Sequence, residues 1–184
     1  MELIALGLNK NCMKNYIAYI LLIVLFSFCK RENESEVLPT KQEKWENRKA
    51  GISAFDSLPV GKTYLSVYSH IYHIHEHRTY DLTVTVSIRN VSVTDSVYIL
   101  SAEYFNTKGE KIRDYFKAPI YLTPMETVEI VINEADKEGG SGANFIFDWA
   151  VKNIKNPPLF EAVMISTYGQ QGLSFSTRGV RVYD

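Results

Sequence analysis

The sequence has little cysteine, no excess of basic charge and no complete catalytic motif. Its 184 residues include two cysteines, Cys12 and Cys29, and 20 basic against 21 acidic residues, which gives a formal net charge of -1. Without a basic surplus there is no broad positive field to hold a phosphate backbone. We therefore expect no nucleic acid among the partners of this protein.

Long hydrophobic runs are also missing, and the one apolar run present is typical of an export signal. Lys10 and Lys14 precede an uncharged apolar run over residues 17–28, which Cys29 closes. The run is shorter than the roughly 20 residues that a spanning helix needs. Cations before a short apolar run follow the order of a signal peptide, whether the chain starts at Met1 or at Met13.

Cys29 resembles the acylation site of bacterial lipoproteins, in which the residue after the cleavage site carries the lipid. Residues 1–28 are then a signal peptide of the lipoprotein type, and the protein is exported to the cell envelope and anchored to a membrane, facing the periplasm or the cell surface. Phe28 departs from the small residue usual before such a cysteine, so a plain signal anchor is the alternative. Cleavage leaves a single cysteine, which excludes a structural disulfide in the mature chain.

Residues 29–60 are rich in charge of both signs and poor in apolar side chains. Such a composition buries too little surface to offset the entropy of ordering, so we expect a charged, disordered linker. A short helix over residues 42–50, with Trp45 as its packing residue, is the alternative.

Residues 61–184 are predicted to form an all-β domain. Leu82, Val84, Val86 and Ile88 alternate with polar residues, which is the period of a half-buried strand. Asn106 and Gly109 lie in a turn between two further strands and predict a hairpin. We expect seven to eight strands in an antiparallel two-sheet sandwich, immunoglobulin-like, with a closed barrel as the alternative. The other strands are expected over residues 97–105, 111–116, 127–133, 145–151, 160–167, 173–176 and 180–183.

All four histidines lie between residues 70 and 77. On a strand, residues two apart lie about 6.6 Å apart on one face, so His75 with His73 or His77 is the easy chelating pair. His70 and His73 have opposite parity and face opposite ways in a regular strand. Zinc or copper binding through His70, His73 and His77 requires the chain to bend between residues 74 and 79, with Glu76 or Asp81 as a possible carboxylate ligand. Otherwise these histidines bond to the backbone and to tyrosine hydroxyls at the end of a strand.

A glycine-rich segment offers a second candidate site, formed by Gly139, Gly140, Ser141, Gly142 and Asn144. Successive backbone N–H groups could bind an anion there, or the segment is only a tight connector between strands. Ser141 has the spacing of a nucleophile elbow, but that motif needs a helix after the serine and a strand is expected instead. Asp148 and Glu161 lie within apolar strand patterns, each either paired and buried or on the solvent face, and they do not identify a catalytic pair.

Six blocks of sequence occur in the order residues 68–73, 82–90, 139–145, 156–159, 161–165 and 171–175. Together they resemble domain-of-unknown-function family 3124 of bacterial proteins, over roughly residues 64–181. The resemblance implies a cell-envelope domain, often behind a lipoprotein-type signal, with no established activity, cofactor or catalytic residue. His70, His73 and His77 fall on positions of the family pattern, whereas His75 does not.

Three hypotheses follow from the sequence. The leading one is a non-enzymatic envelope lipoprotein, without a cofactor, whose domain has a structural role or binds a protein, glycan or small ligand through residues 70–78 and 139–145. The second is a periplasmic or surface metal-binding protein that uses His70 to His77. The third is a hydrolase that uses Ser141 with a histidine.

Overall fold

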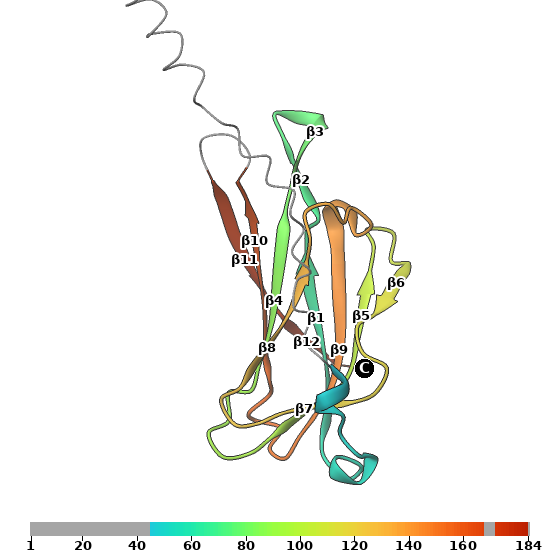
Figure 1. Cartoon of the computed structure of the whole chain (residues 1–184), viewed down its shortest axis with the longest axis vertical. Coiled ribbons are helices and arrows are strands. Elements are labelled where there is room, and N and C mark those ends of the chain that lie inside the picture. Colours follow the sequence, from blue (N-terminus) through green and yellow to red (C-terminus); the bar gives the residue numbers. More distant parts are fainter. Residues whose placement is uncertain (1–44, 168–171, 184) are drawn as a thin grey trace, which may run out of the picture. The chain divides into compact units, whose positions relative to one another are not determined.

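The computed structural model describes residues 45–167 and 172–183, and these residues form an all-β domain with antiparallel sheets (Figure 1). No helix in this part of the chain has the length and the apolar character needed to cross a membrane. The signal peptide predicted over residues 1–28, the lipidation site Cys29 and the linker up to residue 44 lie outside the described residues.

The strands form two main sheets and a separate hairpin. The large sheet has the order β12 (Val180–Val182), β1 (Val60–Val67), β9 (Ala143–Val151), β5 (Val97–Phe105) and β6 (Lys111–Asp114), and β7 (Ile120–Leu122) also pairs with β5. The small sheet has the order β11 (Leu173–Arg178), β10 (Leu159–Ser166), β4 (Thr83–Arg89) and β8 (Thr127–Ile132). The hairpin consists of β2 (His70–His73) and β3 (His75–Asp81).

The apolar alternation in the sequence correctly locates the buried faces of the strands. Val84, Val86 and Ile88 of β4 are fully buried, as the period-two pattern predicts. The hairpin of β5 and β6 is also confirmed: the side-chain oxygen of Asn106 accepts hydrogen bonds from two backbone N–H groups of the turn, and Gly109 has a positive φ of 78°.

The expected number of seven to eight strands is wrong, because the described residues contain twelve. Strand β1 was not predicted from the sequence. Its first two core-facing positions are Gly61 and Thr63, so large apolar side chains do not alternate there. Strand β7, which has only three residues, was also not predicted. The histidine stretch forms two strands where a single strand leading into a bend was expected.

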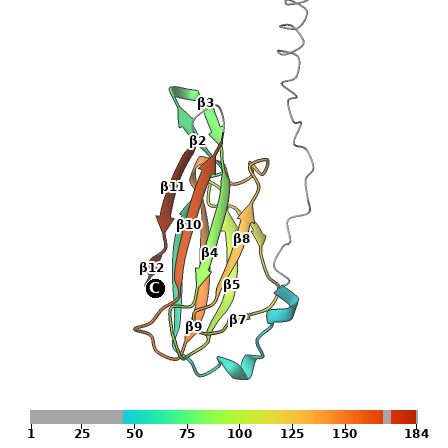
Figure 2. The same ribbon diagram turned by 60° about the vertical axis from the view of Figure 1, so that its left-hand side comes forward.

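The two main sheets face each other across one hydrophobic core (Figure 2). The rings of Phe147 on β9 and Phe160 on β10 stack across the sheets with their centroids 4.4 Å apart. Trp149, the largest buried side chain, donates its indole N–H to Thr63 Oγ1 at 2.9 Å, so the polar atom that it buries is satisfied.

Within the described residues, the segment before β1 also contacts this core, although a disordered linker was expected there. Trp45–Arg48 form a 3-10 helix, η1, and a second one, η2, covers Ile52–Ala54. The ring of Trp45 lies 5.4 Å from that of Phe116, and the backbone N–H of Ala50 donates to Pro119 at 2.8 Å. Trp45 is therefore the packing residue, as expected for the alternative of a short helix.

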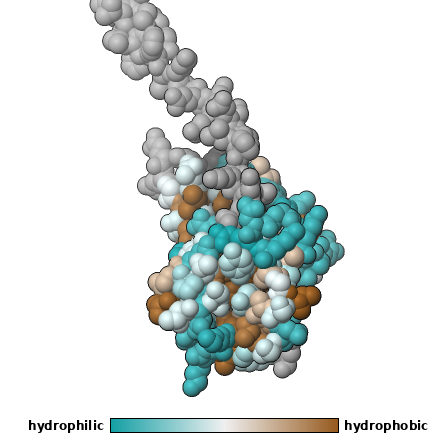
Figure 3. Space-filling model, turned by 60° about the horizontal axis from the view of Figure 1, so that its bottom comes forward, coloured by the Kyte–Doolittle hydropathy of each residue, from teal (hydrophilic) through white to brown (hydrophobic). Residues whose placement is uncertain are grey.

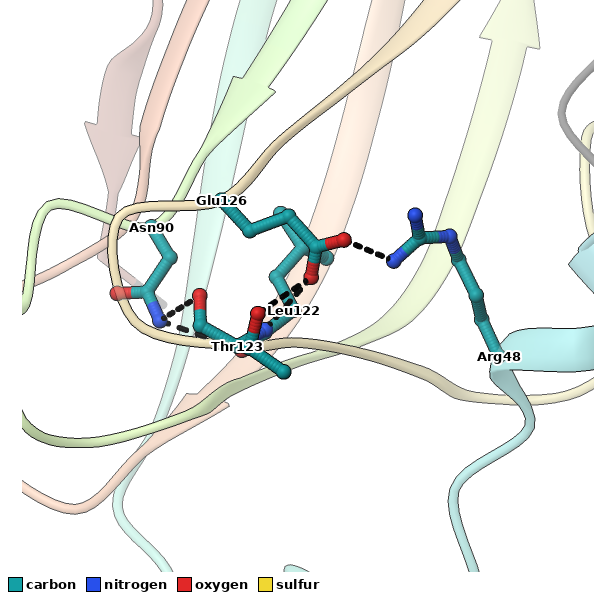
Figure 4. Close-up of polar contacts among 5 residues, drawn as sticks. All are labelled: Arg48, Asn90, Leu122, Thr123 and Glu126. Atoms are coloured by element: carbon teal, nitrogen blue, oxygen red, sulfur yellow. Dashed lines mark hydrogen bonds and ion pairs between the residues drawn. The ribbon is translucent and has the colours of Figure 1, made fainter.

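Polar contacts fix the loops at the end of the domain away from the hairpin (Figure 4). Asn90 is 2% exposed and donates its side-chain amide to the carbonyl groups of Asp95, Leu122 and Thr123. Glu126 accepts two hydrogen bonds from Thr123 and one from Arg48, the latter at 2.6 Å. This carboxylate thus links the segment before β1 to the loop between β7 and β8.

Candidate functional site: the histidine hairpin

The β2–β3 hairpin extends beyond the ends of both main sheets (Figures 1 and 2). Its strands pair from His70 with Asp81 to His73 with His75, and Ile74 alone forms the turn. Ile74 has a φ of 65°, a left-handed conformation that is rare for a β-branched residue. The register shifts between Tyr72 and His73, so residues 76–78 form an extra, exposed stretch of β3.

The tip of the hairpin exposes apolar side chains. Tyr72 is 57% exposed and Ile74 is 81% exposed. Together with His73, His75 and Glu76 they line a shallow hollow at the tip. A strained, exposed isoleucine is not explained by packing, and such strain is concentrated at functional positions. Neither Ile74 nor Tyr72 was selected from the sequence, because the positive φ of Ile74 and the exposure of both side chains depend on the fold of the hairpin.

The base of the hairpin is held firmly to the rest of the domain. The backbone of Ser69 donates to Gly140 O at 3.0 Å and accepts from Leu82 N at 2.9 Å. The Ser69 hydroxyl shares a buried hydrogen bond of 3.2 Å with the hydroxyl of Tyr104. Lys137 lies 2.9 Å from Asp81 at the end of β3. These contacts position an exposed tip on a rigid base.

The structure separates the histidines that the metal hypothesis combines. His70 lies edge-on to Tyr72, whereas His73 stacks on Tyr80 with the ring centroids 3.9 Å apart, so the two occupy opposite faces of the hairpin as their parity predicts. Within the described ranges, no group of three or more His, Cys, Asp or Glu side chains is arranged to hold a metal ion.

One pair of histidines whose rings lie close together is His75 and His77. Their ring centroids are 5.9 Å apart, and His75 Nδ1 accepts a hydrogen bond from the backbone of His77 at 3.2 Å. His77 Nε2 lies 3.5 Å from Glu76 Oε1. This pair includes His75, which does not fall on a position of the family pattern. His70, His73 and His77 therefore do not converge on one site in this structure.

The glycine-rich segment is used for packing around Ser69 and Tyr104. Gly140–Gly142 form a 3-10 helix, η3, and Gly139 precedes it in the αR region. A Cβ atom on Gly139 would overlap the Tyr104 hydroxyl and would lie 2.7 Å from Ser69 Oγ, so only glycine fits. The backbone N–H of Gly140 donates to Lys137 O at 3.2 Å, and that of Gly142 donates to Thr107 Oγ1 at 3.0 Å. Two N–H groups of the expected anion nest thus already have partners.

One predicted feature of this segment differs in the structure, and another is confirmed. Asn144 is not a loop residue, because it lies on β9 between Ser66 and Phe105. A strand follows Ser141, as expected, so the helix of a nucleophile elbow is missing there. No hydrogen bond joins Ser141 to a histidine within residues 45–167 and 172–183.

Burial keeps the tyrosines beneath this segment neutral. Desolvation raises the pKa of Tyr104 above its ordinary value, against the lowering effect of its hydrogen bond to Ser69. Desolvation also raises the pKa of Tyr115, against the lowering effect of Arg113. These phenols act as hydrogen-bonding core residues and are poor candidates for a general base.

Asp148 and Glu161 lie on different sheets and each has a basic neighbour. Asp148 accepts a hydrogen bond from Ser101 at 2.8 Å and lies 3.3 Å from Lys62 Nζ. Glu161 lies 3.4 Å from Arg89 Nε. Both side chains are half-buried and charge-paired, so they do not form a catalytic pair.

A comparison with known protein families gives one match, over residues 60–182, to a family model described as a protein of unknown function (DUF3124). The matched segment begins at the first residue of β1 and ends at the last residue of β12. No curated protein and no solved structure matches the chain.

Proposed function

The chain belongs to the DUF3124 family of proteins of unknown function, and from this premise we propose that it is a non-catalytic protein of the bacterial cell envelope. In this proposal a lipid on Cys29 anchors the chain to a membrane, and the tip of the β2–β3 hairpin binds a partner protein.

The exposure of the hairpin tip carries the proposal. Ile74 and Tyr72 present apolar and aromatic surface on an element that stands apart from both main sheets. A few anchor residues, with tyrosine among the most frequent types, contribute most of the free energy of many protein–protein interfaces when they enter a desolvated pocket on the partner. The left-handed φ of Ile74 destabilises the free domain, and a binding role explains why the residue is kept there.

A protein partner fits this surface better than a glycan or a small ligand. The hollow at the tip is shallow and is lined by side chains of one short segment, Tyr72 to Glu76. Small-molecule sites are usually concave and bury most of the ligand. A projecting apolar tip instead suits insertion into a pocket on another protein.

Photo-crosslinking in intact cells tests the binding role. A photoreactive amino acid at Tyr72 of the full chain is expected to give a discrete protein adduct. The matched control is the same photoreactive group at Val93, which is 74% exposed. Val93 lies in the loop after the C-terminal end of β4, whereas the hairpin precedes the N-terminal end of that strand. An identical adduct pattern from both positions, or no adduct from Tyr72, contradicts the proposal.

The lipid anchor is inferred from the order of basic and apolar residues before Cys29. Labelling with a radioactive or alkynyl palmitate is expected to mark the full chain and to fail with Cys29→Ser. Label retained by Cys29→Ser would remove the lipoprotein assignment, whatever the result of crosslinking at Tyr72.

Metal binding is kept as a second candidate because His75 and His77 lie together at the tip. Two histidines supply only part of a zinc site, since structural sites usually have four protein ligands. Zinc titration of the full chain is expected to show binding that His77→Ala weakens and His70→Ala leaves unchanged. Equal effects of the two variants would exclude this pair as the site.

An immunoglobulin-like arrangement of the sandwich is also part of the proposal. The second strand pairs with the fifth, and the third with the sixth, in immunoglobulin sandwiches. The pairing of β4 with β8 and of β5 with β9 supports this relation. The arrangement departs from it at β1, which lies beside β9 where the last immunoglobulin strand would lie. An experimental structure in which β4 does not pair with β8, or β5 does not pair with β9, would contradict it.

A further inference from the structure

A cavity of about 300 Å³ lies at the side of the domain where the chain crosses between the sheets. The crossing is at Gly179, between β11 of the small sheet and β12 of the large sheet. The backbone N–H of Gly179 donates to Phe160 O at 2.8 Å, which holds the crossing against β10. The loop that contains Pro157 and Pro158 forms another wall. This cavity is separate from the histidine hairpin, and none of its residues belongs to the binding surface proposed above.

Three cations line this cavity, Lys155, Arg178 and Arg181, and its lining contains no carboxylate. Their side chains form no ion pair with any carboxylate in the part of the chain that the structure describes. Glu161 is the cross-strand partner of Arg178, but its carboxylate lies near Arg89. Among the described residues, the three cations around the cavity therefore have no carboxylate within ion-pair distance, and such a concave positive site attracts anions.

Arg181 packs against two aromatic rings. Its guanidinium carbon lies 5.3 Å from the ring centre of Trp149 and 4.9 Å from that of Tyr183. The Trp149 ring is itself fixed by its hydrogen bond to Thr63, which pairs with Arg181 across β1 and β12. Arg181 Nε is buried and has no acceptor among the described residues. These ring contacts limit the orientations open to the planar donor group, and a restricted donor loses less entropy on binding.

We propose that this cavity binds the phosphate group of a small phosphate monoester, with Arg181 as the main ligand-binding residue and with Arg178 and Lys155 adding positive charge. Arginine pairs with phosphate through two parallel hydrogen bonds. Three cations suit a dianionic phosphate better than a single carboxylate. The volume is at the lower end of the range for ligand sites, about 300–1,000 Å³, so the substituent on the phosphate must be small.

Isothermal titration calorimetry on the detergent-solubilised full chain tests the proposal with two probes, inorganic phosphate and glycerol 3-phosphate. Phosphatidic acid in mixed micelles of the same detergent, against phosphatidylcholine in the same micelles, tests whether a lipid headgroup supplies the phosphate instead. Glycerol 3-phosphate is expected to bind, more weakly at high salt. Preferential binding to phosphatidic acid with no binding of the free probes would assign the site to a headgroup and overturn the free monoester.

The variants distinguish specific binding in the cavity from nonspecific electrostatic attraction to the protein surface. Arg181→Gln is expected to weaken the binding of glycerol 3-phosphate at least about tenfold, since it removes the bidentate donor. Arg178→Gln is expected to weaken it several-fold, and Lys108→Gln, which removes the same charge from the exposed turn after β5, is expected to leave it unchanged.

Arg181→Lys keeps the positive charge but removes the planar guanidinium that makes two parallel hydrogen bonds. It serves as a second variant in case Arg181→Gln does not fold. With a melting temperature equal to that of the wild type, Arg181→Lys should still bind more weakly. No binding of any probe to the wild type, or equal losses in Arg181→Gln and Lys108→Gln, would overturn the proposal.

Discussion

Ser69 and Tyr104 share a buried hydrogen bond of 3.2 Å between their hydroxyl groups, and this bond joins the base of the histidine hairpin to the large sheet. Ser69 is the residue immediately before β2, and Tyr104 lies near the end of β5. Because burial raises the pKa of Tyr104, its hydroxyl stays protonated and can donate throughout the physiological pH range. The position of the exposed tip thus depends on a contact in the core.

Gly139→Ala should destabilise the domain by about 1–3 kcal/mol, the usual range for overpacking. A Cβ at this position meets the Tyr104 hydroxyl, Ser69 Oγ and Ala143 Cβ. Gly51→Ala is the control, because its Cβ would have only Ser53 Oγ within 4 Å, at 3.9 Å. Urea unfolding of both variants measures the difference, and equal midpoints would show that the glycine-rich segment yields to the extra methyl group.

Thr63→Val should lower the free energy of unfolding by about 1–3 kcal/mol, because it leaves the buried indole N–H of Trp149 without an acceptor. Thr63→Ser keeps the hydroxyl and should retain most of that stability. Thermal unfolding followed by tryptophan fluorescence compares the two variants. If Thr63→Val were as stable as Thr63→Ser, the hydrogen bond to Trp149 would not contribute to folding.

The ionised carboxylate of Glu126 should stabilise the domain at neutral pH, and this stabilisation should be lost in acid. Partial burial acts to raise its pKa, but hydrogen bonds from Thr123 and Arg48 outweigh burial, and the pKa falls below its ordinary value of 4.5. A carboxyl group with a lowered pKa contributes stability above 4.5, and this contribution is lost as the pH falls through the folded-state pKa.

Glu126→Gln should therefore lower stability on the order of 1 kcal/mol at pH 7, and the difference from the wild type should shrink below pH 4.5. Glu129→Gln, on the exposed face of β8, is the control and should change little at any pH. Denaturant unfolding at a series of pH values makes the measurement. A difference that is constant from pH 7 to pH 3 would contradict the role of the Glu126 charge.

Much of the fold follows from local sequence pattern, and the exceptions have physical causes. β4, β8 and β9 alternate clearly because one face of each strand packs in the core. The pairing of β1 beside β9 and β12 depends on contacts between segments more than 75 residues apart in the sequence, such as Trp149 with Thr63 at a separation of 86. Alternation within one segment cannot carry that information.

The candidate site was only partly predictable for the same reason. Parity correctly placed His70 and His73 on opposite faces of β2. The turn at Ile74 was not predictable, since turn rules assign positive φ to Gly, Asn or Asp. The glycine-rich segment was recognised, but its reason, the space taken by Tyr104 and Ser69, comes from distant strands. Arg181 was not selected because its aromatic neighbour Trp149 is 32 positions earlier in the sequence.

Ile74→Asn should weaken partner binding without lowering the stability of the domain. Asparagine tolerates a left-handed φ, so relief of the strain at this position should leave the melting temperature unchanged or raise it. Ile74 is 81% exposed, so its replacement removes little buried surface. The same replacement removes the apolar group at the centre of the proposed binding surface.

The most direct test of the binding role combines Ile74→Asn with crosslinking from Tyr72 in intact cells, at matched protein levels. The account predicts that the adduct formed from Tyr72 disappears in the variant while the melting temperature of the purified protein does not fall. An adduct of undiminished yield in a fully folded Ile74→Asn variant would contradict the proposal that the hairpin tip is the binding element.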